Sequence, residues 1–339
     1  MREPHRHPAV LATMAGNHGI ITRRQTLALG LTPADIARAV RAGEWVVVRR
    51  GHYVAQELWD GLDRYVGRPR LEARVAWLGM RNDHAISHDS AAAYLGISTL
   101  KQEQPLIHLT RLGPPRARVR HGIKRHQARV LLPHLQQVDG VVVLDAARTA
   151  VDIAREHGLE AGVVAIDSAR LRGVRLEDLW AAIEPMWRWP GITTARAALE
   201  LSDARAESAG ESLARMLLEE LGLGPIETQF EIRDDVRWAR CDLRVGRHLV
   251  EFDGFLKYQR RDLDERGRID PEQVVWEEKQ RQDWLLGYHL GMSRLIWADF
   301  WGSRRRLAME RLAREHALTC ARFGTSIDDL AHLVVRRAA

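Results

Sequence analysis

Residues 19–56 read GIITRRQTLALGLTPADIARAVRAGEWVVVRRGHYVAQ and hold three segments of different periodicity. Thr22 can cap a short helix that Gly30 ends, and Thr32 followed by proline can open a second helix. We expect the apolar side chains of the second helix to share one face: Ile36, Ala37 and Val40. The final WVVVRRGHYV alternates in polarity and turns at its glycine, which is typical of a β-hairpin.

Helix, short turn, helix and hairpin predict a winged helix-turn-helix, which places its second helix in the major groove of DNA. Arg38 and Arg41 would then face the bases, and Arg49 and Arg50 in the hairpin would meet phosphates. The alternative is a small helical domain whose arginines only keep it soluble. The candidate DNA contacts in this segment are Arg23, Arg24, Arg38, Arg41, Arg49 and Arg50.

The opening GIITRRQ, the segment TPADIARAVRAGEW and the hairpin RRGHYV also resemble the N-terminal winged-helix domain of AbiEi-type antitoxins. These proteins are the DNA-binding partners in type IV toxin–antitoxin systems. The resemblance covers roughly the first 55 residues, and residues 57–160 look more diffusely like the middle part of the same proteins. It implies sequence-specific operator binding, autoregulation and a cognate toxin as partner.

The charge of the 339-residue chain is unevenly distributed. Lys and Arg number 51 against 45 Asp and Glu, a net charge of +6. Residues 1–140 hold 21 of these bases against 11 acids, and the remainder holds 30 against 34. A basic half is suited to a polyanion such as double-stranded DNA, whereas the second half concentrates carboxylates.

Other classes are disfavoured by composition. No uncharged apolar run approaches the ~18 residues that span a bilayer, and the N-terminus lacks the apolar core of a secretory signal. Cys241 and Cys320 are too few for a disulfide framework or a four-cysteine zinc site. We therefore expect a cytoplasmic protein with no membrane partner. The histidines show no zinc-type spacing with cysteine: His5, His7, His84, His88, His121 and His126.

Residues 57–160 predict a basic mixed α/β region. Within it, RLGPPRARVRHGIKRHQARV at residues 111–130 holds seven Lys and Arg and no acid. On a β-ribbon, alternation would place Arg116, Arg118 and Arg120 on one face, and Lys124 follows the turn. Phosphate contact is one interpretation, and a solvated strand edge guarded by charge is the other.

From residue 206 the patterns predict a helix, three strands, a helix and a strand, with the hairpin CDLRVGRHLVEFDG at residues 241–254. Glu251 and Asp253 are two residues apart on one strand, so they share a face, and pairing across the turn can place Asp242 beside them. Glu211 on the preceding helix could supply a fourth oxygen ligand. Such carboxylates repel one another unless a divalent cation is bound, so we expect Mg²⁺ or Mn²⁺ there.

This arrangement resembles the PD-(D/E)XK superfamily of restriction-endonuclease-like folds. LVEFDGFLKY looks most like the Vsr-type branch, in which a later helix carries Arg and Asp, here Arg281 and Asp283 in EEKQRQDWL. The resemblance covers about residues 206–300. It implies a metal that activates water for attack on a phosphodiester.

One position departs from that superfamily, because Asp253 stands where lysine is usual. Lys257 and Lys279 are the candidates to supply the missing positive charge, and we favour Lys279 because a helix holds a donor more firmly than a loop. The role could also be unfilled, which would leave a fold that binds DNA or metal without cutting.

The predicted fold is thus a multi-domain α/β protein. Its segments are a winged helix-turn-helix at 1–56, a basic mixed α/β region at 57–160, a helical linker at 161–205, a nuclease-like αβββαβ domain at 206–302 and a helical segment at 303–339. Two hypotheses follow: a metal-dependent DNA endonuclease, or an antitoxin-like transcriptional regulator whose nuclease-fold domain is inactive. The predicted partners are double-stranded DNA, a cognate toxin and a second copy of the chain.

Overall fold

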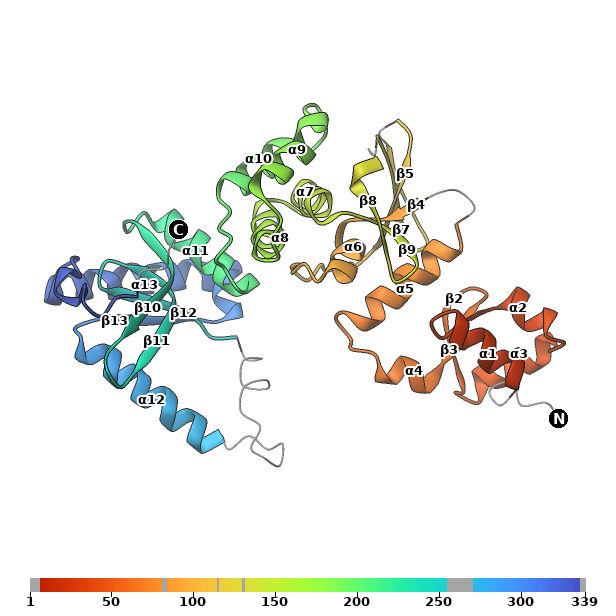
Figure 1. Ribbon diagram of the computed structural model, residues 1–339, viewed down its shortest axis with the longest axis horizontal. Helices are drawn as coiled ribbons and strands as arrows, with labels where there is room; N and C mark the ends of the chain where they lie inside the picture. Colours follow the sequence, from red (N-terminus) through yellow and green to blue (C-terminus); the bar gives the residue numbers. More distant parts are fainter. Residues whose placement is uncertain (1–6, 81–83, 115, 130–131, 255–270, 336–339) are drawn as a thin grey trace. The chain divides into compact units, whose positions relative to one another are not determined.

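The computed structural model describes residues 7–80, 84–114, 116–129, 132–254 and 271–335. The chain divides into two compact units, Met1–Ile153 and Ala154–Ala339 (Figure 1). Three β-sheets occur in the described residues, two in the first unit and one in the second. Among the helices of that described part, none is long and apolar enough to traverse a lipid bilayer.

The first unit begins with three helices and a small antiparallel sheet of strand order β1-β3-β2. The helices are α1 (Pro8–Gly16), α2 (Arg23–Ala28) and α3 (Pro33–Arg41), and the strands are β1 (Ile20–Thr22), β2 (Trp45–Arg49) and β3 (His52–Ala55). This is the predicted layout of a winged helix, with β2 and β3 as the wing.

Two capping boxes explain why α2 and α3 start where they do. The Thr22 side chain accepts from the Gln25 backbone N–H while the Gln25 side chain bonds back to residue 22, and Thr32 and Asp35 repeat the arrangement. Each box satisfies two amide groups that a helix start leaves unpaired, which confirms both predicted caps.

The buried face of α3 differs in one position from the prediction. Ile36 and Ala39 are buried and Val40 is half-buried, whereas Ala37 is exposed. One helical residue rotates the side chain by about 100°, so position 37 leaves the face that positions 36, 39 and 40 share. The core around it joins α1, α3 and the three strands, with Leu31 between α2 and α3: Val10, Met14, Ile21, Leu31, Ile36, Ala39, Trp45 and Tyr53.

The rest of the first unit is a six-stranded sheet of order β6-β7-β5-β4-β9-β8. Its strands are β4 (His84–Ile86), β5 (Ile107–Leu112), β6 (Arg116–Arg120), β7 (Ile123–Ala128), β8 (Leu135–Val138) and β9 (Val141–Leu144). This part of the chain also contains the helices α4 (Gln56–Gly61), α5 (Gly67–Leu78) and α6 (His88–Leu95), and α7 (Ala146–His157) follows the last strand. A core that includes Ala73, Ala91 and Leu109 joins α5 and α6 to the sheet.

The second unit starts at Ala154, inside α7, and continues with α8 (Leu159–Leu171), α9 (Leu176–Ile183) and α10 (Ile192–Glu200). Then follow α11 (Ala209–Leu221), β10 (Ile226–Arg233), β11 (Trp238–Val245), β12 (His248–Phe252), α12 (Pro271–Gly287), β13 (Gly291–Leu295) and α13 (Gly302–Phe323). The sheet order is β10-β11-β12-β13, with antiparallel pairs except for the parallel pair of β12 and β13. The predicted succession of helix, three strands, helix and strand is therefore present.

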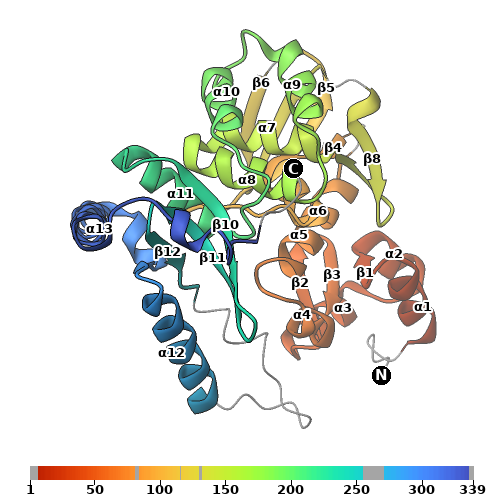
Figure 2. The same ribbon diagram turned by 60° about the vertical axis from the view of Figure 1, so that its left-hand side comes forward.

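Helices cover both faces of this sheet (Figure 2). Gly210 of α11 lies so close to Phe252 of β12 that a Cβ atom there would approach the ring to 2.1 Å. Leu285 of α12 packs instead with Leu249, whose side chain points to the other face of β12 because neighbours alternate. This packing fixes β12 between α11 and α12.

Candidate functional site

The solvent face of α3 carries the residues predicted to contact DNA bases. Ala34, Ala37 and Arg41 are exposed, and the Arg38 side chain is 41% exposed although it pairs with Asp35 at 3.2 Å. The spacing 34, 37, 38 and 41 puts them on one stripe of the helix. Two alanines beside two arginines let the helix backbone approach a groove while long donors reach the base edges.

The wing places its two predicted arginines differently. Arg50 is exposed, whereas the Arg49 guanidinium donates a 2.6 Å hydrogen bond to the backbone oxygen of His121. Burial lowers the pKa of the Arg49 guanidinium, and the carboxylate of Glu72 opposes that effect. Arg49 therefore already has a partner within the first unit, at the turn between β6 and β7.

Strands β6 and β7 form a basic ribbon, residues 116–128, at the edge of the six-stranded sheet. All five residues of β6 are exposed, and the register places Arg118 directly opposite Arg125. Like charges opposite each other destabilise a strand pair, whereas a bound polyanion would relieve their repulsion. As predicted, strand alternation puts three arginines on one face: Arg116, Arg118 and Arg120.

Three other predicted contacts lie outside the α3 stripe and outside the arginine face of the ribbon. Arg23 and Arg24 are exposed at the start of α2. Lys124 is half-buried and lies on the opposite face of the ribbon from Arg118, because Arg118 pairs with position 125.

In the second unit, Glu251 contacts an arginine. Arg281 Nη2 of α12 donates to both Glu251 carboxylate oxygens, at 2.6 and 2.7 Å, and the Glu251 side chain is 12% exposed. Glu278 accepts from Arg281 Nε at 3.0 Å and pairs with Arg294 of β13. These four residues, Glu251, Glu278, Arg281 and Arg294, form what we call the carboxylate–arginine cluster.

The charges within the cluster stabilise one another. Burial lowers the pKa of the Arg281 guanidinium, but hydrogen bonds and charges from Glu278 and Glu251 outweigh burial and hold that pKa above its ordinary value. Cys241 lies next to this cluster, and burial, with the nearby Glu251 charge, raises the pKa of its thiol to about 12. At neutral pH the thiol is protonated and unreactive.

The other predicted metal ligands also have structural contacts. Asp242 Oδ2 accepts the backbone N–H of Phe252 at 2.8 Å, and the pairing of β11 with β12 stops at Leu243–Val250, before Asp242 and Glu251. Glu211 is 2% exposed and accepts from the Glu207 backbone N–H at 2.9 Å and from Gln229 Nε2 at 2.7 Å.

Among the described residues, neither Asp253 nor Lys279 makes a hydrogen bond or ion pair with the Glu251 side chain. Asp253 is half-buried just beyond β12, where its backbone N–H donates to Leu295 at 2.8 Å. Lys279 is exposed, and because it is two positions before Arg281 it lies about 200° away around α12. Lys257 lies outside the described residues.

This geometry does not fit a bound Mg²⁺. Within the part of the chain that the structure describes, no three potential ligand atoms within 4.8 Å of one another include Asp242, Glu251 or Asp253. A hard cation needs several convergent oxygens, and here both Glu251 oxygens accept from a guanidinium. We therefore derive no chemical step through a metal at this position.

Glu278 and Arg294 were missed by the sequence interpretation. Glu278 lies three residues before Arg281, so both occupy one face of a helix, and this spacing was available. Arg294 reaches the cluster because β13 pairs in parallel with β12, where its register partner is Glu251. That pairing has no local sequence signal.

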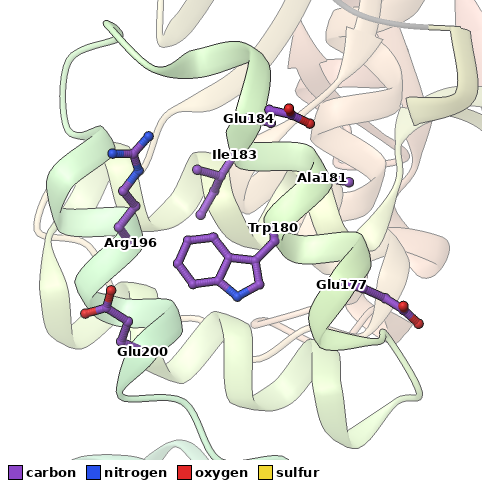
Figure 3. Close-up of a pocket in the computed structure, with 7 residues that line it drawn as sticks. All are labelled: Glu177, Trp180, Ala181, Ile183, Glu184, Arg196 and Glu200. Carbon is purple, nitrogen blue, oxygen red and sulfur yellow. The ribbon is translucent and has the colours of Figure 1, made fainter.

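The second unit also has an open hollow of about 670 Å³ between α9 and α10 (Figure 3). Trp180 and Arg196 line it together with three carboxylates, Glu177, Glu184 and Glu200. The excess of negative charge disfavours a phosphate ligand, so this hollow is a poor candidate for contact with nucleic acid.

Known proteins match the chain in two parts. Residues 10–56, from α1 to the end of the wing, match the family described as "Transcriptional regulator, AbiEi antitoxin". A wider match is to two proteins of Mycobacterium tuberculosis, the uncharacterized protein MT2308 of strain CDC 1551 / Oshkosh and the uncharacterized protein Rv2248 of strain ATCC 25618 / H37Rv. Each is 34% identical over 234 residues, which cover 66% of this chain and 80% of the relative.

Among solved structures, the RV2827C protein from Mycobacterium tuberculosis aligns with a TM-score of 0.35 and 15% identity, over 61% of this chain and 79% of that one. This likeness is too low to carry an argument. The identity and coverage of the two uncharacterized proteins are sufficient to define a shared family. The chain therefore belongs to the family of MT2308 and Rv2248, and its residues 10–56 match the AbiEi antitoxin family of transcriptional regulators.

Proposed function

We propose that this protein is an antitoxin-like transcriptional regulator that binds double-stranded DNA in a sequence-specific way. The observation that carries the proposal is the exposed stripe of α3, which lies inside the segment that matches the antitoxin family. In a winged helix this helix enters the major groove, where arginine reads guanine through two hydrogen bonds.

The basic ribbon extends the same proposal to the DNA backbone. Its three arginines on one face are exposed, and the hydrogen bond from Arg49 to His121 joins the wing to the turn of the ribbon. Phosphate contacts position a protein on DNA and carry no sequence information. We assign base reading to α3 and backbone binding to the ribbon and Arg50.

The test is fluorescence anisotropy of the full-length protein with two duplexes: the region upstream of its own gene, and a scrambled duplex of equal composition. The double variant R38A/R41A should lose about tenfold or more in affinity for the upstream duplex and most of the preference between duplexes. R118A should weaken binding to both duplexes and lower the salt slope by about one.

The matched control is R306A. Arg306 is a 73% exposed arginine on α13 that pairs with Glu310 at 2.8 Å, so its loss removes the same charge from the other unit. The proposal fails if R38A/R41A binds both duplexes as the wild type does. It also fails if affinity is unchanged between about 50 mM and 200 mM salt, because phosphate contacts release counterions.

The likeness to the antitoxin family supports a cognate toxin as partner and action in the cytoplasm, where the DNA lies; a second copy of the chain as partner is a further part of the proposal. Co-purification of the protein with the product of an adjacent gene, followed by light scattering of the complex, tests the two partners.

A second candidate function is metal-dependent cleavage of phosphodiesters by residues 206–302. Its support is the order of helix, three strands, helix and strand, with β12 parallel to β13 beside two antiparallel pairs. The hydrogen bonds from Arg281 to both Glu251 carboxylate oxygens disfavour metal-dependent cleavage.

Nicking of supercoiled plasmid with Mg²⁺ or Mn²⁺ tests this second function. Wild-type nicking that E251Q abolishes and the exposed control E310Q preserves would support it. A folded wild-type protein that does not nick with either metal would exclude it and leave the regulator.

A further inference from the structure

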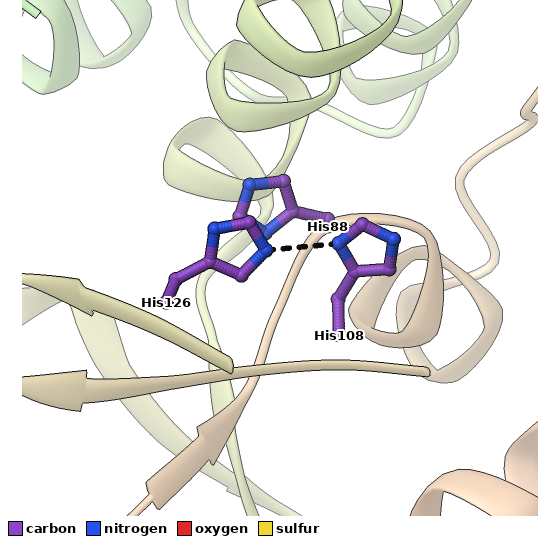
Figure 4. A group of neighbouring side chains, drawn as sticks. All are labelled: His88, His108 and His126. Atoms are coloured by element: carbon purple, nitrogen blue, oxygen red, sulfur yellow. Dashed lines mark hydrogen bonds between the residues drawn. The ribbon is translucent and has the colours of Figure 1, made fainter. Parts of the chain in front are cut away.

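Three histidines from separate elements of the first unit form a cluster: His88, His108 and His126 (Figure 4). Each offers one ring nitrogen, and these three atoms lie within 4.8 Å of one another. His88 and His108 are 4% and 2% exposed, and His126 is half-buried. The proposed DNA contacts use none of them.

The sheet explains why residues so far apart in sequence meet. Strands β5 and β7 are parallel neighbours, with His108 opposite Lys124 and Thr110 opposite His126. Residues directly opposite or two apart share a face, so His108 and His126 project on the same side. His88 is the first residue of α6, which follows directly from β4, the other neighbour of β5.

The backbone at His88 is held in an unfavourable conformation. Its φ is +50°, in the left-handed region that residues with a Cβ rarely adopt. Such strain persists only where the surrounding structure fixes it. Here the Ser87 backbone N–H donates to the His108 carbonyl at 3.1 Å, which anchors the start of α6 to β5.

The nitrogen spacing is close to that of a metal site. His108 Nδ1 and His126 Nε2 are 3.0 Å apart, and two nitrogens bound to one tetrahedral Zn²⁺ would be about 3.3 Å apart. The His88 and His126 rings are stacked at 4.0 Å with planes 16° apart. Convergence of their lone pairs on one ion requires rotation about the Cβ–Cγ bond, which is a broad, soft torsion in histidine.

The groups around the imidazoles are of mixed charge. Asp89 Oδ2 lies 3.8 Å from His108 Nε2, the nitrogen that does not face His126. A carboxylate behind a metal-ligating histidine orients the ring and raises its basicity as a ligand. Ser87 Oγ lies 3.0 Å from His88 Nδ1. Lys124, the register partner of His108, adds a positive charge on this face.

We propose that His88, His108 and His126 bind one divalent transition-metal ion of the zinc class. Neutral imidazole nitrogens suit Zn²⁺, Ni²⁺ and Cu²⁺, whereas Mg²⁺ and Ca²⁺ prefer oxygen. The ion would fasten the start of α6 to β5 and to β7, the inner strand of the basic ribbon. This site is independent of the proposed function, because DNA binding by α3 does not require it.

The test uses full-length protein without a polyhistidine tag, stripped with a chelator and titrated with Zn²⁺ by calorimetry. We expect one equivalent to bind per chain and the thermal midpoint to rise, because the ion binds the native fold. Co²⁺ in place of Zn²⁺ should give visible absorption bands of a nitrogen-ligated ion.

The variant H126A should weaken Zn²⁺ binding by about tenfold or more and remove the Co²⁺ bands. His126 is the most exposed ligand, so its loss disturbs the core least, and H126Q serves as a second variant of similar size. The control is H121N: His121 is exposed on the same ribbon with φ of +50°, which asparagine tolerates. The proposal fails if folded wild type binds no stoichiometric Zn²⁺, or if H126A and H126Q bind it as tightly as wild type and H121N.

Discussion

Arg41 on α3 and Glu251 on β12 were both predicted to act on DNA, one by contact and the other through a metal. In the structure Arg41 is exposed on a helix stripe, whereas both carboxylate oxygens of Glu251 accept hydrogen bonds from Arg281. The Arg41 guanidinium thus faces solvent, whereas the Glu251 carboxylate is paired inside the second unit. A charged residue that lacks an internal partner can bind a ligand without first breaking a contact. The contacts around Arg41 and Glu251 therefore distinguish their roles better than the residue types do.

The largest expected effect comes from breaking the internal pair. R281M leaves the Glu251 carboxylate, 12% exposed, with Arg294 at 3.9 Å as its remaining cation. Removing one partner of a buried pair costs about 3 kcal/mol, so the free energy of unfolding should fall by about that amount in urea titrations.

The double variant E251Q/R281M should recover most of that loss, because it removes the uncompensated charge as well. An R281M unfolding curve that superimposes on the wild-type curve would show that the carboxylate–arginine cluster does not stabilise the second unit. The contrast between the exposed Arg41 and the internally paired Glu251 would then have no energetic basis.

A smaller loss is expected from T32A at the start of α3. It removes the acceptor for the Asp35 backbone N–H and should cost about 1 kcal/mol in thermal or urea unfolding. T13A in α1, which removes only a bond to the Ala9 carbonyl, is the control and should be near neutral. Equal destabilisation by both variants would contradict the cap assignment.

A gain of stability is expected from R118E in the basic ribbon. The new carboxylate would face Arg125 in place of a like charge, which is worth about 0.2–1 kcal/mol. DNA affinity should fall at the same time. R116E faces Gln127 and should gain less stability. If R118E loses stability, Arg118 has a structural role that the exposed β6 strand does not reveal.

The smallest effect concerns Asp234, another carboxylate of the second unit that accepts hydrogen bonds from neighbouring residues. Backbone N–H groups of Val236 and Arg237 lower its pKa to about 2, and Trp284 Nε1 donates to it at 2.8 Å. A lowered pKa stabilises the fold above the unfolded value of 3.8, and this contribution is lost as pH falls through about 2. D234N should flatten the acid limb of a thermal-midpoint curve between about pH 5 and pH 2, whereas the neighbouring D235N should retain it.

The sequence was sufficient for features set by local rules. Thr22 and Thr32 cap helices because a hydroxyl followed by a suitable third residue satisfies the helix start in any context. The placement of Arg116, Arg118 and Arg120 on one face of β6 follows from strand alternation. The error at Ala37 arose because the extent of a buried face depends on what packs against it, here α1 and the sheet.

Features set by distant pairings could not be read from the sequence. A carboxylate such as Glu251 is compatible with a metal or with an arginine, and the choice depends on how α12 lies across β12. The spacing of the histidines relative to cysteine predicts no zinc site, whereas the parallel pairing of β5 and β7 brings His108 and His126 together. The interval between them is occupied by β6, which lies at the sheet edge and contributes no ligand.

The hydrogen bond from Arg49 to the His121 carbonyl has a consequence for mutational scanning of the wing. Alanine at position 49 would release the β6–β7 turn, so a loss of DNA affinity there would report altered geometry of two elements together with any lost phosphate contact. Combining variants separates the altered geometry from the lost phosphate contact. If R49A acts through the turn, its effect on DNA affinity should be smaller in a variant whose β6 arginines are already neutral. Arg50, the adjacent residue, offers the direct measurement of a single charge.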